Sequence, residues 1–517
     1  MSRLFENANQ IRAGDIHAPT VHGNYNDFRV SAPPTDGVSQ LLLPHIAAGA
    51  LHNSDDRCDV PKCHPDTRVA VQDSILGWAT RTSASANSEA GLTSDIMWVT
   101  GPAGTGKTAI AGSIAEACHN QGSMAGAFFF SSFSGDIRRW SKRYFVATLA
   151  YQIMRLQCFQ DASREVELAI RQDPAIFEKR LGDQLETLIL RPLREWAARR
   201  LAESESSEPI PRVIIVDGLD ECEAGSPPHS ATIGDATQKN EGEELEQRRR
   251  RNEESQAEIL NVLKQLVSDP ACPFRVIVFS RPETVIRHFF SDLGTDTYRE
   301  IFLDNKYDPD TDIELFLTAK FAEIRFRHPD LPASWPSKEI IKLLVALASG
   351  QFIYAATVLR FVDGPSRNPY LLLEQLLKNN TCADTKGPSP LAPLDQLYTS
   401  IMSRCHDPEL LATWISIWDS YGGVVIVDNF YWEPSYLPRS AFFWRMLLST
   451  YPGEADSLLD NLASLIAIPP RDDLEAEFHF YHRTFQEFLS DPRRNGLPIV
   501  KKGRAAALYS KHVPLKY

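Results

Sequence analysis

Short runs of apolar residues alternate with longer amphipathic stretches between residues 66 and 307. A short apolar run is typical of a strand that is buried on both faces of a sheet, and the intervening spacing favours helices. Strands that alternate with helices predict an α/β core, a mostly parallel sheet with helices on both faces. The predicted strands are Ile96–Val99, Ala127–Phe130, Val213–Val216, Arg275–Phe279 and Glu300–Leu303, and the predicted helices include Ala109–Cys118, Tyr144–Leu156, Arg180–Leu201 and Gln256–Val267.

The pattern changes after Asp308, where strand-like runs largely stop. Helical periodicity continues, and a segment rich in Pro, Gly and Ser at residues 381–393 separates two mainly helical regions. We therefore predict an α/β domain at 61–307, a helical domain at 308–392, a second mainly helical domain at 393–490 and a tail at 491–517. The predicted helices of the first helical domain are Thr311–Ile324, Lys338–Ser349, Tyr354–Phe361 and Tyr370–Lys378, and Leu394–Cys405 opens the second.

Two segments lack regular periodicity. Residues 1–60 are rich in Asn, Gly, His and Pro, which favours a poorly ordered leader. A short signalling segment of β-arch type is the alternative, because Ile11, Ile16 and Val21 recur five residues apart. Residues 223–255 are of low complexity and predict a solvated loop with a mixed-charge helical end, or a segment that shields a nearby site.

Composition indicates a globular chain of several domains. The 517 residues are 43% hydrophobic, and the net charge of −13 argues against a nucleic-acid partner, leaving only a local basic patch as an alternative. Eight scattered cysteines and a polar N-terminus predict a reducing, cytoplasmic location. The uncharged stretch Leu343–Leu359 is short for a membrane span, so we expect two buried helices that meet near Gly350 and no membrane contact.

The strongest chemical signal follows the first predicted strand. The pattern G-x-x-x-x-G-K-[ST] between a strand and a helix is that of a phosphate-binding loop, in which backbone N–H groups surround an anion. The lysine of such a loop reaches the β- and γ-phosphates, and the hydroxyl after it binds Mg²⁺. The alternative is a glycine-rich turn that binds nothing. The loop residues are Gly101, Pro102, Ala103, Gly104, Thr105, Gly106, Lys107 and Thr108.

The strand Val213–Val216 ends in acidic residues. A carboxylate at this place faces the phosphate loop, so Asp217 is the candidate Mg²⁺ ligand. A further acid can orient the attacking water, and Asp220 or Glu221 is the candidate for this role. The motif is weak alone, but together with the phosphate loop it predicts a site for nucleotide hydrolysis.

A third motif, Ser280-Arg281-Pro282, ends the strand at Arg275–Phe279. An arginine at this position could sense the γ-phosphate or stabilise the transferred charge. The alternative is an arginine that only caps the strand or pairs with a surface acid.

These three motifs together resemble a NACHT domain, the nucleotide-binding module of NOD-like receptor-type STAND proteins. Further pieces resemble the fungal branch of this family, whose domain is also described as nephrocystin-3-like. The resemblance extends over roughly residues 40–490. The additional pieces are Cys63-His64-Pro65-Asp66-Thr67-Arg68, Phe128-Phe129-Phe130, Tyr151-Gln152 and Phe480-Tyr481-His482-Arg483-Thr484-Phe485-Gln486-Glu487-Phe488.

The resemblance implies a P-loop NTPase core followed by a helical domain and a winged-helix domain. It implies that Arg68 lies beside the nucleotide and that His482 contacts the β-phosphate of ADP in a closed state. From the residues alone, His482 could equally be a histidine of the core or surface. The family's Gly-x-Pro element, which contacts the nucleotide, matches Gly350-Gln351-Phe352 here, with Phe in place of Pro.

The resemblance implies a signalling switch of the kind found in innate immunity, which binds ATP or ADP with Mg²⁺ and hydrolyses ATP slowly. Exchange of ADP for ATP would then permit opening, self-association and contact with a protein partner. A scaffold that keeps ADP with little hydrolysis is the alternative, since no repeat array that could serve as a sensor is found. A kinase or motor ATPase is a third possibility, but no acceptor-site motif supports it. Adenine is implied by the resemblance only.

Overall fold

The part of the chain that can be described runs from the short helix at Gly37 to Asn495. The computed structural model describes residues 37–495 except 58–61, 81–94, 133–135, 204–209, 225–240, 295–296, 304–306, 364–367, 382–390, 404–409, 412–413, 415–425, 428–429, 432–439, 450, 452 and 460–461. The predicted β-arch at Ile11, Ile16 and Val21 and the tail after residue 495 lie outside this part.

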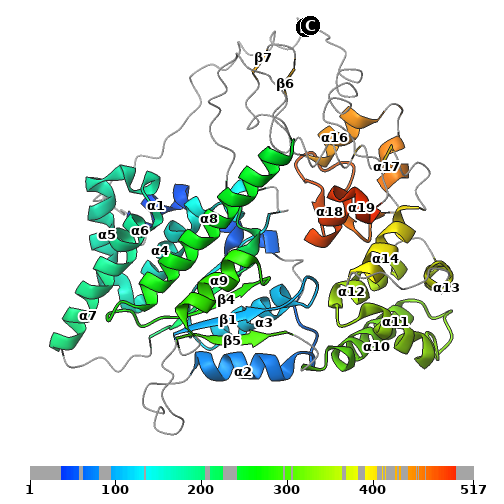
Figure 1. The fold of residues 1–517 in the computed structure, drawn as a ribbon, viewed down its shortest axis with the longest axis horizontal. Coiled ribbons are helices and arrows are strands. Elements are labelled where there is room, and N and C mark those ends of the chain that lie inside the picture. The colour runs from blue at the N-terminus through cyan, green and yellow to red at the C-terminus, as the bar shows by residue number, and fades with distance from the viewer. Residues whose placement is uncertain are drawn as a thin grey trace, which may run out of the picture.

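A five-stranded parallel sheet forms the centre of the N-terminal half (Figure 1). The order across the sheet is β2-β3-β4-β1-β5, so β4 lies between the strand before the phosphate loop and the strand that ends in Asp217. All five predicted strands are therefore confirmed. Because they are parallel, their carboxyl ends share one edge, where ligands of such sheets bind. The strands are β1 (Ile96–Thr100), β2 (Met124–Phe129), β3 (Val213–Asp217), β4 (Arg275–Ser280) and β5 (Arg299–Phe302).

Helices cover both faces of this sheet, as predicted. Successive side chains of a strand point to opposite faces, so Trp98 packs against the helices on one face and Val99 against those on the other. One face is covered by α2 (Val69–Ala79) and α3 (Lys107–Asn120). The other face is covered by α4 (Phe145–Met154), α5 (Gln160–Gln172), α6 (Leu181–Leu185), α7 (Arg191–Glu203), α8 (Glu241–Val267) and α9 (Thr284–Leu293).

Residues 37–57 belong to the α/β core, whereas the sequence placed them in a leader of residues 1–60. Short helices at Gly37–Leu42 (α1), Leu43–His45 (η1), Ala48–Ala50 (η2) and Asp55–Arg57 (η3) form this segment. Val38, Leu42 and Ile46 are buried in the same cluster as α4 and α5. The helices are too short to show a clear period in the sequence, and their apolar residues gain burial only from the folded core.

The low-complexity segment at 223–255 ends in a helix, as expected. The helix α8 begins at Glu241, and Arg248, Arg249 and Arg250 are exposed on it. Residues 225–240 lie outside the described part, so the idea that this segment shields the site stays a prediction.

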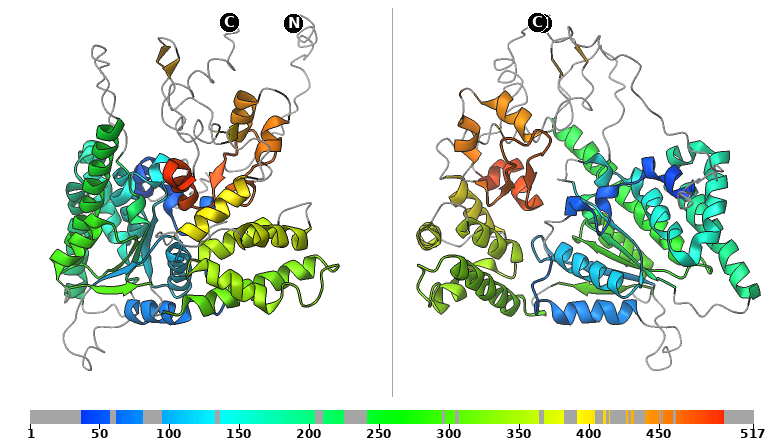
Figure 2. Two further views of the ribbon diagram at one scale, coloured as in Figure 1. Left: turned by 45° about the vertical axis from the view of Figure 1, so that its right-hand side comes forward. Right: turned by 180° about the vertical axis from the view of Figure 1, so that it is seen from behind.

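A second apolar cluster holds the helices after Asp308 together, beside the sheet domain (Figure 2). The turn between α11 and α12 has positive φ at Ser349 and Gly350, which separates the uncharged stretch into two helices as predicted. The helices are α10 (Pro309–Arg327), α11 (Lys338–Ala348), α12 (Phe352–Val362), α13 (Pro369–Thr381) and α14 (Ala392–Met402).

The second apolar cluster continues through the C-terminal elements. There β8 and β9 pair antiparallel directly before α18, whose Phe485 and Phe488 are buried. The predicted winged-helix domain stays a prediction. The elements of this region are β6 (Ile426–Val427), β7 (Phe430–Tyr431), α16 (Ala441–Leu448), α17 (Glu454–Leu459), β8 (Ile466–Ala467), β9 (His479–Phe480), α18 (Arg483–Ser490) and α19 (Pro492–Asn495).

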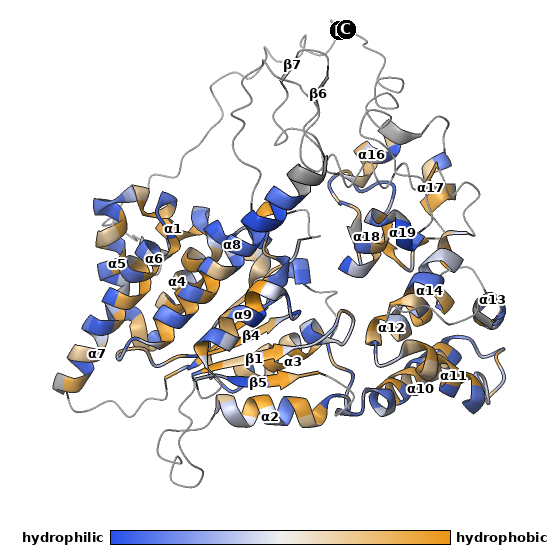
Figure 3. Ribbon diagram, in the orientation of Figure 1, coloured by the Kyte–Doolittle hydropathy of each residue, from blue (hydrophilic) through white to orange (hydrophobic). Residues whose placement is uncertain are grey.

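Apolar residues concentrate on the strands and on the inner faces of the helices, whereas the exposed part of α8 is hydrophilic (Figure 3). Within the described residues, no helix is both long enough and apolar enough to cross a bilayer.

Candidate functional site

A cavity of about 590 Å³ lies at the carboxyl edge of the sheet, against the C-terminal elements. Its walls come from parts of the chain that are far apart in sequence. They include the phosphate loop, residues 56–57 and 62–68, the segments after β2, β3 and β4, the start of α12 and residues 467–483. A ligand in this cavity would therefore contact both the sheet domain and the C-terminal elements.

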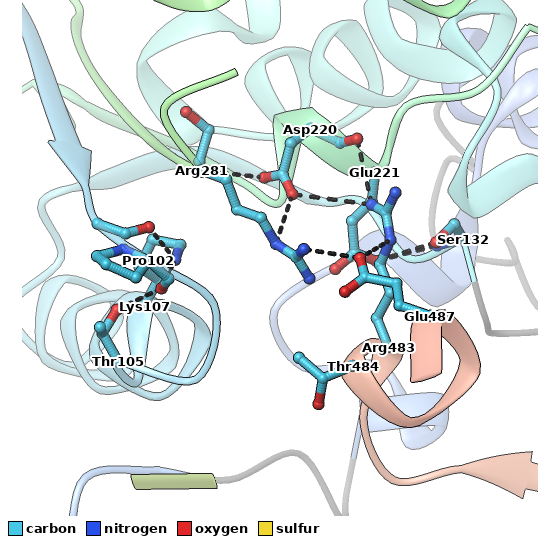
Figure 4. A network of polar contacts seen from close by, with 12 residues as sticks. Pro102, Thr105, Lys107, Ser132, Asp220, Glu221, Arg281, Arg483, Thr484 and Glu487 are labelled. Atoms are coloured by element: carbon cyan, nitrogen blue, oxygen red, sulfur yellow. Dashed lines mark hydrogen bonds and ion pairs between the residues drawn. The ribbon is translucent and has the colours of Figure 1, made fainter. Parts of the chain in front are cut away.

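The phosphate loop has the expected form. It joins β1 to α3, and Gly104 and Gly106 adopt φ values of +80° and +90° that favour glycine. The ammonium of Lys107 donates to the carbonyl oxygens of Gly101 and Pro102, each at 2.7 Å (Figure 4). Burial lowers the pKa of Lys107 to about 8. The predicted loop residues 103–108 line the cavity.

Asp217 lies where a Mg²⁺ ligand is needed. Its side chain ends β3 and is only 2% exposed, and its Oδ1 has no hydrogen-bond partner. Burial raises the pKa of this carboxyl to about 6, while Arg57 and the Thr108 hydroxyl lower it. A buried, unpaired carboxylate oxygen beside a hydroxyl is a donor set that suits Mg²⁺, which prefers oxygen ligands. Thr108 and Asp217 therefore fit the ion that the sequence predicted for them.

The two acids after Asp217 differ in their surroundings. Asp220 accepts from the Arg281 backbone N–H at 3.0 Å, and its Oδ2 lies 3.3 Å from Arg281 Nε. Burial acts to raise the pKa of Asp220, but Arg281, Arg483 and Lys107 outweigh it and hold the pKa below its usual range. Asp220 is thus an ionised partner of arginines. The sequence could not separate its role from that of Glu221.

Glu221 has the properties of a proton acceptor near neutral pH. Its Oε2 accepts from the Ser132 backbone N–H at 3.1 Å, and its side chain lines the cavity. Burial raises its pKa to about 7. A general base works best when its pKa lies near the working pH, so Glu221 is the better candidate of the two.

Arg281 is bound both by a residue of the sheet domain and by a residue of α18 (Figure 4). Its Nη1 donates to Glu487 of α18 at 2.7 Å, while its Nε faces Asp220. Arg483 joins them, because its Nη1 donates to the Asp220 carbonyl oxygen at 3.2 Å and its Nε lies 3.2 Å from Glu487. We call Asp220, Arg281, Arg483 and Glu487 the arginine–carboxylate network. The sequence analysis gave no role to Arg483 or Glu487, although both lie within the segment 480–488 that carries part of the resemblance.

His482 lies in the same cavity as the phosphate loop, although 374 positions separate it from Thr108 (482 − 108). It is the N-cap of α18, and its Nδ1 accepts from the Thr484 backbone N–H at 3.1 Å. The neutral ring must therefore carry its proton on Nε2, which makes Nε2 a donor. Burial, together with the charges of Arg281 and Lys107, lowers the pKa of His482 to about 3. A neutral donor in this position suits a phosphate oxygen.

Arg68 lies against the phosphate loop, as expected. Its Nη2 donates to the Thr105 carbonyl oxygen at 3.3 Å, and its guanidinium lies 5.0 Å from the centre of the Phe352 ring. The residue after Phe352, Ile353, donates its backbone N–H to the Gly104 carbonyl oxygen at 3.3 Å. The predicted contact element at Gly350-Gln351-Phe352 therefore leads directly into the loop and the cavity.

Aromatic side chains form the wall around Phe352. The Phe316 ring lies 6.1 Å from Phe352 and 6.0 Å from His64, and all three line the cavity. Flat apolar faces of this kind suit the stacking of a nucleobase.

Four further cationic residues line the cavity and were not identified from the sequence. They are Arg57, Lys62, Arg139 and Arg360. None of them belongs to a local motif, and only the folding of distant segments brings them to the phosphate loop.

Comparison with known proteins supports part of the resemblance. Residues 76–242 match the family described as nephrocystin 3, N-terminal, so the chain is similar to that family from α2 to the start of α8. The match includes the phosphate loop and Asp217, but it ends before Arg281 and His482. No match among curated proteins is found.

Proposed function

We propose that this protein is a nucleotide-dependent switch of the STAND type, which binds ATP or ADP with Mg²⁺ and hydrolyses ATP slowly. The observation that carries the proposal is the composition of the cavity wall. The phosphate loop, the start of α12 and His482 line the same cavity, so a bound nucleotide would join the sheet domain to the C-terminal elements. A ligand that contacts two bodies can favour one arrangement of them over another.

The residues of the cavity support hydrolytic chemistry. Lys107 and the loop N–H groups bind the phosphates, and Thr108 and Asp217 would hold Mg²⁺, which neutralises phosphate charge when bound. Glu221, with a pKa near 7, accepts a proton from an attacking water. The aromatic wall with Phe352 receives the base, for which adenine is our proposal.

The arginine–carboxylate network supports a closed resting state. Glu487 accepts a hydrogen bond from Arg281, the arginine that the sequence predicts as a sensor of the γ-phosphate. A triphosphate that attracts Arg281 competes with this ion pair, so α18 would be released. Release would expose surfaces for self-association and for a protein partner.

An ADP-bound scaffold is the second candidate. The same ion pair favours it, because an arginine held by Asp220 and Glu487 is withdrawn from transition-state stabilisation. The scaffold and the switch differ in turnover and in assembly, which can both be measured.

The test is to purify the full chain, identify the co-purifying nucleotide by mass spectrometry and measure ATP turnover. We expect ADP, and slow turnover that falls by more than about tenfold in Lys107→Ala and Glu221→Gln. Lys264→Ala, an exposed lysine on α8, is the matched control and keeps full turnover.

Each other result has a clear meaning. A protein that neither carries nor binds a nucleotide contradicts both candidates. ADP without turnover or ATP-dependent assembly contradicts the switch and favours the scaffold.

A further inference from the structure

Arg57 and Arg139 are two buried cations in the wall of the cavity. They are 8% and 7% exposed, and both line the cavity. The Nε atom of each has no hydrogen-bond partner. Among the described residues, no carboxylate lies within 4.0 Å of either guanidinium. A buried cation is costly unless an anion or a hydrogen-bond acceptor meets it.

The surrounding structure fixes both side chains. The Arg57 guanidinium lies over the Phe129 ring, 3.2 Å from its centre. Arg139 ends a short helix, where its backbone N–H donates to Asp136 and its carbonyl oxygen accepts from Ser131, each at 3.0 Å. Gly49 permits the approach of Arg139, because a Cβ at Gly49 would lie 2.9 Å from Arg139 Cδ. The two guanidinium groups are thus preorganised.

Both groups face the hydrolytic side of the cavity. Burial lowers the pKa of Arg57 to about 9, and the charge of Asp217 opposes this. Burial also lowers the pKa of Arg139, which Asp56, Glu221, Asp136 and Asp217 oppose. The arginines therefore lie near the carboxylates that are assigned to Mg²⁺ and water.

We propose that Arg57 and Arg139 bind the terminal phosphate of a nucleoside triphosphate and so distinguish triphosphate from diphosphate. This inference rests on the proposed nucleotide site. Lys107 reaches the β-phosphate that both nucleotides share as well as the γ-phosphate, whereas Arg281 is held by Asp220 and Glu487 in the closed arrangement. The Nε atoms of the two arginines have no hydrogen-bond partner among the described residues, and guanidinium groups suit phosphate oxygens.

The experiment compares two ligands in the full chain with Mg²⁺ present: ADP and a non-hydrolysable β,γ-imido analogue of ATP. Affinities are measured by calorimetry for the wild type, Arg57→Gln and Arg139→Gln. We expect each variant to lose at least about tenfold in affinity for the ATP analogue and to keep its affinity for ADP within about threefold. Arg138→Gln is the matched control, since Arg138 adjoins Arg139 but pairs with Asp136 at 3.1 Å and is exposed.

Unchanged ADP affinity also shows that a variant is folded. Arg57→Lys and Arg139→Lys provide the second test if a Gln variant fails to fold, and we expect them to lose less affinity for the analogue. Equal losses for both nucleotides, or no loss for either, overturn the inference. A wild type that binds neither nucleotide refutes the proposed function itself. If the wild type binds both nucleotides and the variants bind each of them with the same affinity as the wild type, only the role of these arginines is refuted.

Discussion

At the scale of single residues, burial at the cavity assigns different protonation behaviour to similar side chains. Asp220 is held ionised by arginines, whereas burial raises the pKa of Glu221 to about 7 from the ordinary value of 4.5. The sequence presents both as acids after a strand. Only the positions of Arg281 and Arg483 decide which one can accept a proton from water.

Glu221 should make stability depend on pH. Between pH 4.5 and about 7 the folded protein holds a proton that the unfolded chain has released, so stability falls as the pH rises through this interval. We expect Glu221→Gln to raise the free energy of unfolding at pH 8 by roughly 1–2 kcal/mol, and the unfolding temperature with it. At pH 4.5 we expect little effect.

Thermal unfolding of the nucleotide-free protein at the two pH values measures this effect. Glu253→Gln, on the exposed part of α8, serves as the control and shows no such difference. The same shift at both pH values would show that the proton on Glu221 is not the cause.

At the scale of elements, the helix α18 contacts the sheet domain through charged groups at the cavity. Arg281 and Arg483 both reach Glu487, which therefore links β4 to α18. Contacts between charged groups separate more readily than a continuous apolar interface, so α18 can leave the sheet domain while Phe485 and Phe488 stay in the second apolar cluster.

Glu487→Gln should loosen this helix. The variant keeps the side-chain shape but removes the charge that holds two arginines, and we expect release of a fluorescent ADP derivative to become about tenfold faster. Hydrogen exchange at residues 483–490 should rise in parallel. Glu323→Gln on α10, whose carboxylate pairs only with Lys320 of its own helix, is the control. Unchanged release would show that α18 does not guard the site.

How well the elements could be predicted depended on their apolar pattern. The strands of the sheet are continuous apolar runs, and α11 has a clear helical period, so these were found to within a few residues. The segment 37–57 was missed because its short helices have no period to detect. Asp217 and the phosphate loop belong to local motifs, but Arg57 and Arg139 become neighbours only through folding.

At the scale of the whole molecule, the sheet domain and the C-terminal elements line one cavity. The sheet domain and the C-terminal elements each have a buried core of their own. The described contacts between them at the cavity include the ion pair of Arg281 with Glu487 and the backbone hydrogen bond from Ile353 to Gly104. A nucleotide would therefore couple two bodies that can each remain folded.

Calorimetric unfolding should report this coupling. Without nucleotide we expect separate transitions for the two bodies, and with Mg²⁺ and ADP at a hundred times Kd a stabilisation of about 2.7 kcal/mol that both transitions share. His482→Ala should confine the stabilisation to the sheet domain, while His288→Ala on α9 should behave like the wild type. A single transition that His482→Ala leaves unchanged would argue against a ligand that joins the bodies.

The sequence positions of the cavity wall have a consequence for synthesis of the protein. The wall requires residues from Asp56 to Arg483. A nascent chain that has reached residue 307 already has the sheet and the phosphate loop, but α12 and His482 have not yet been made. We expect the growing chain to bind nucleotide in an open site first, and to enclose it only when translation has passed α18. The nucleotide present at the ribosome would then determine the state in which each new molecule begins.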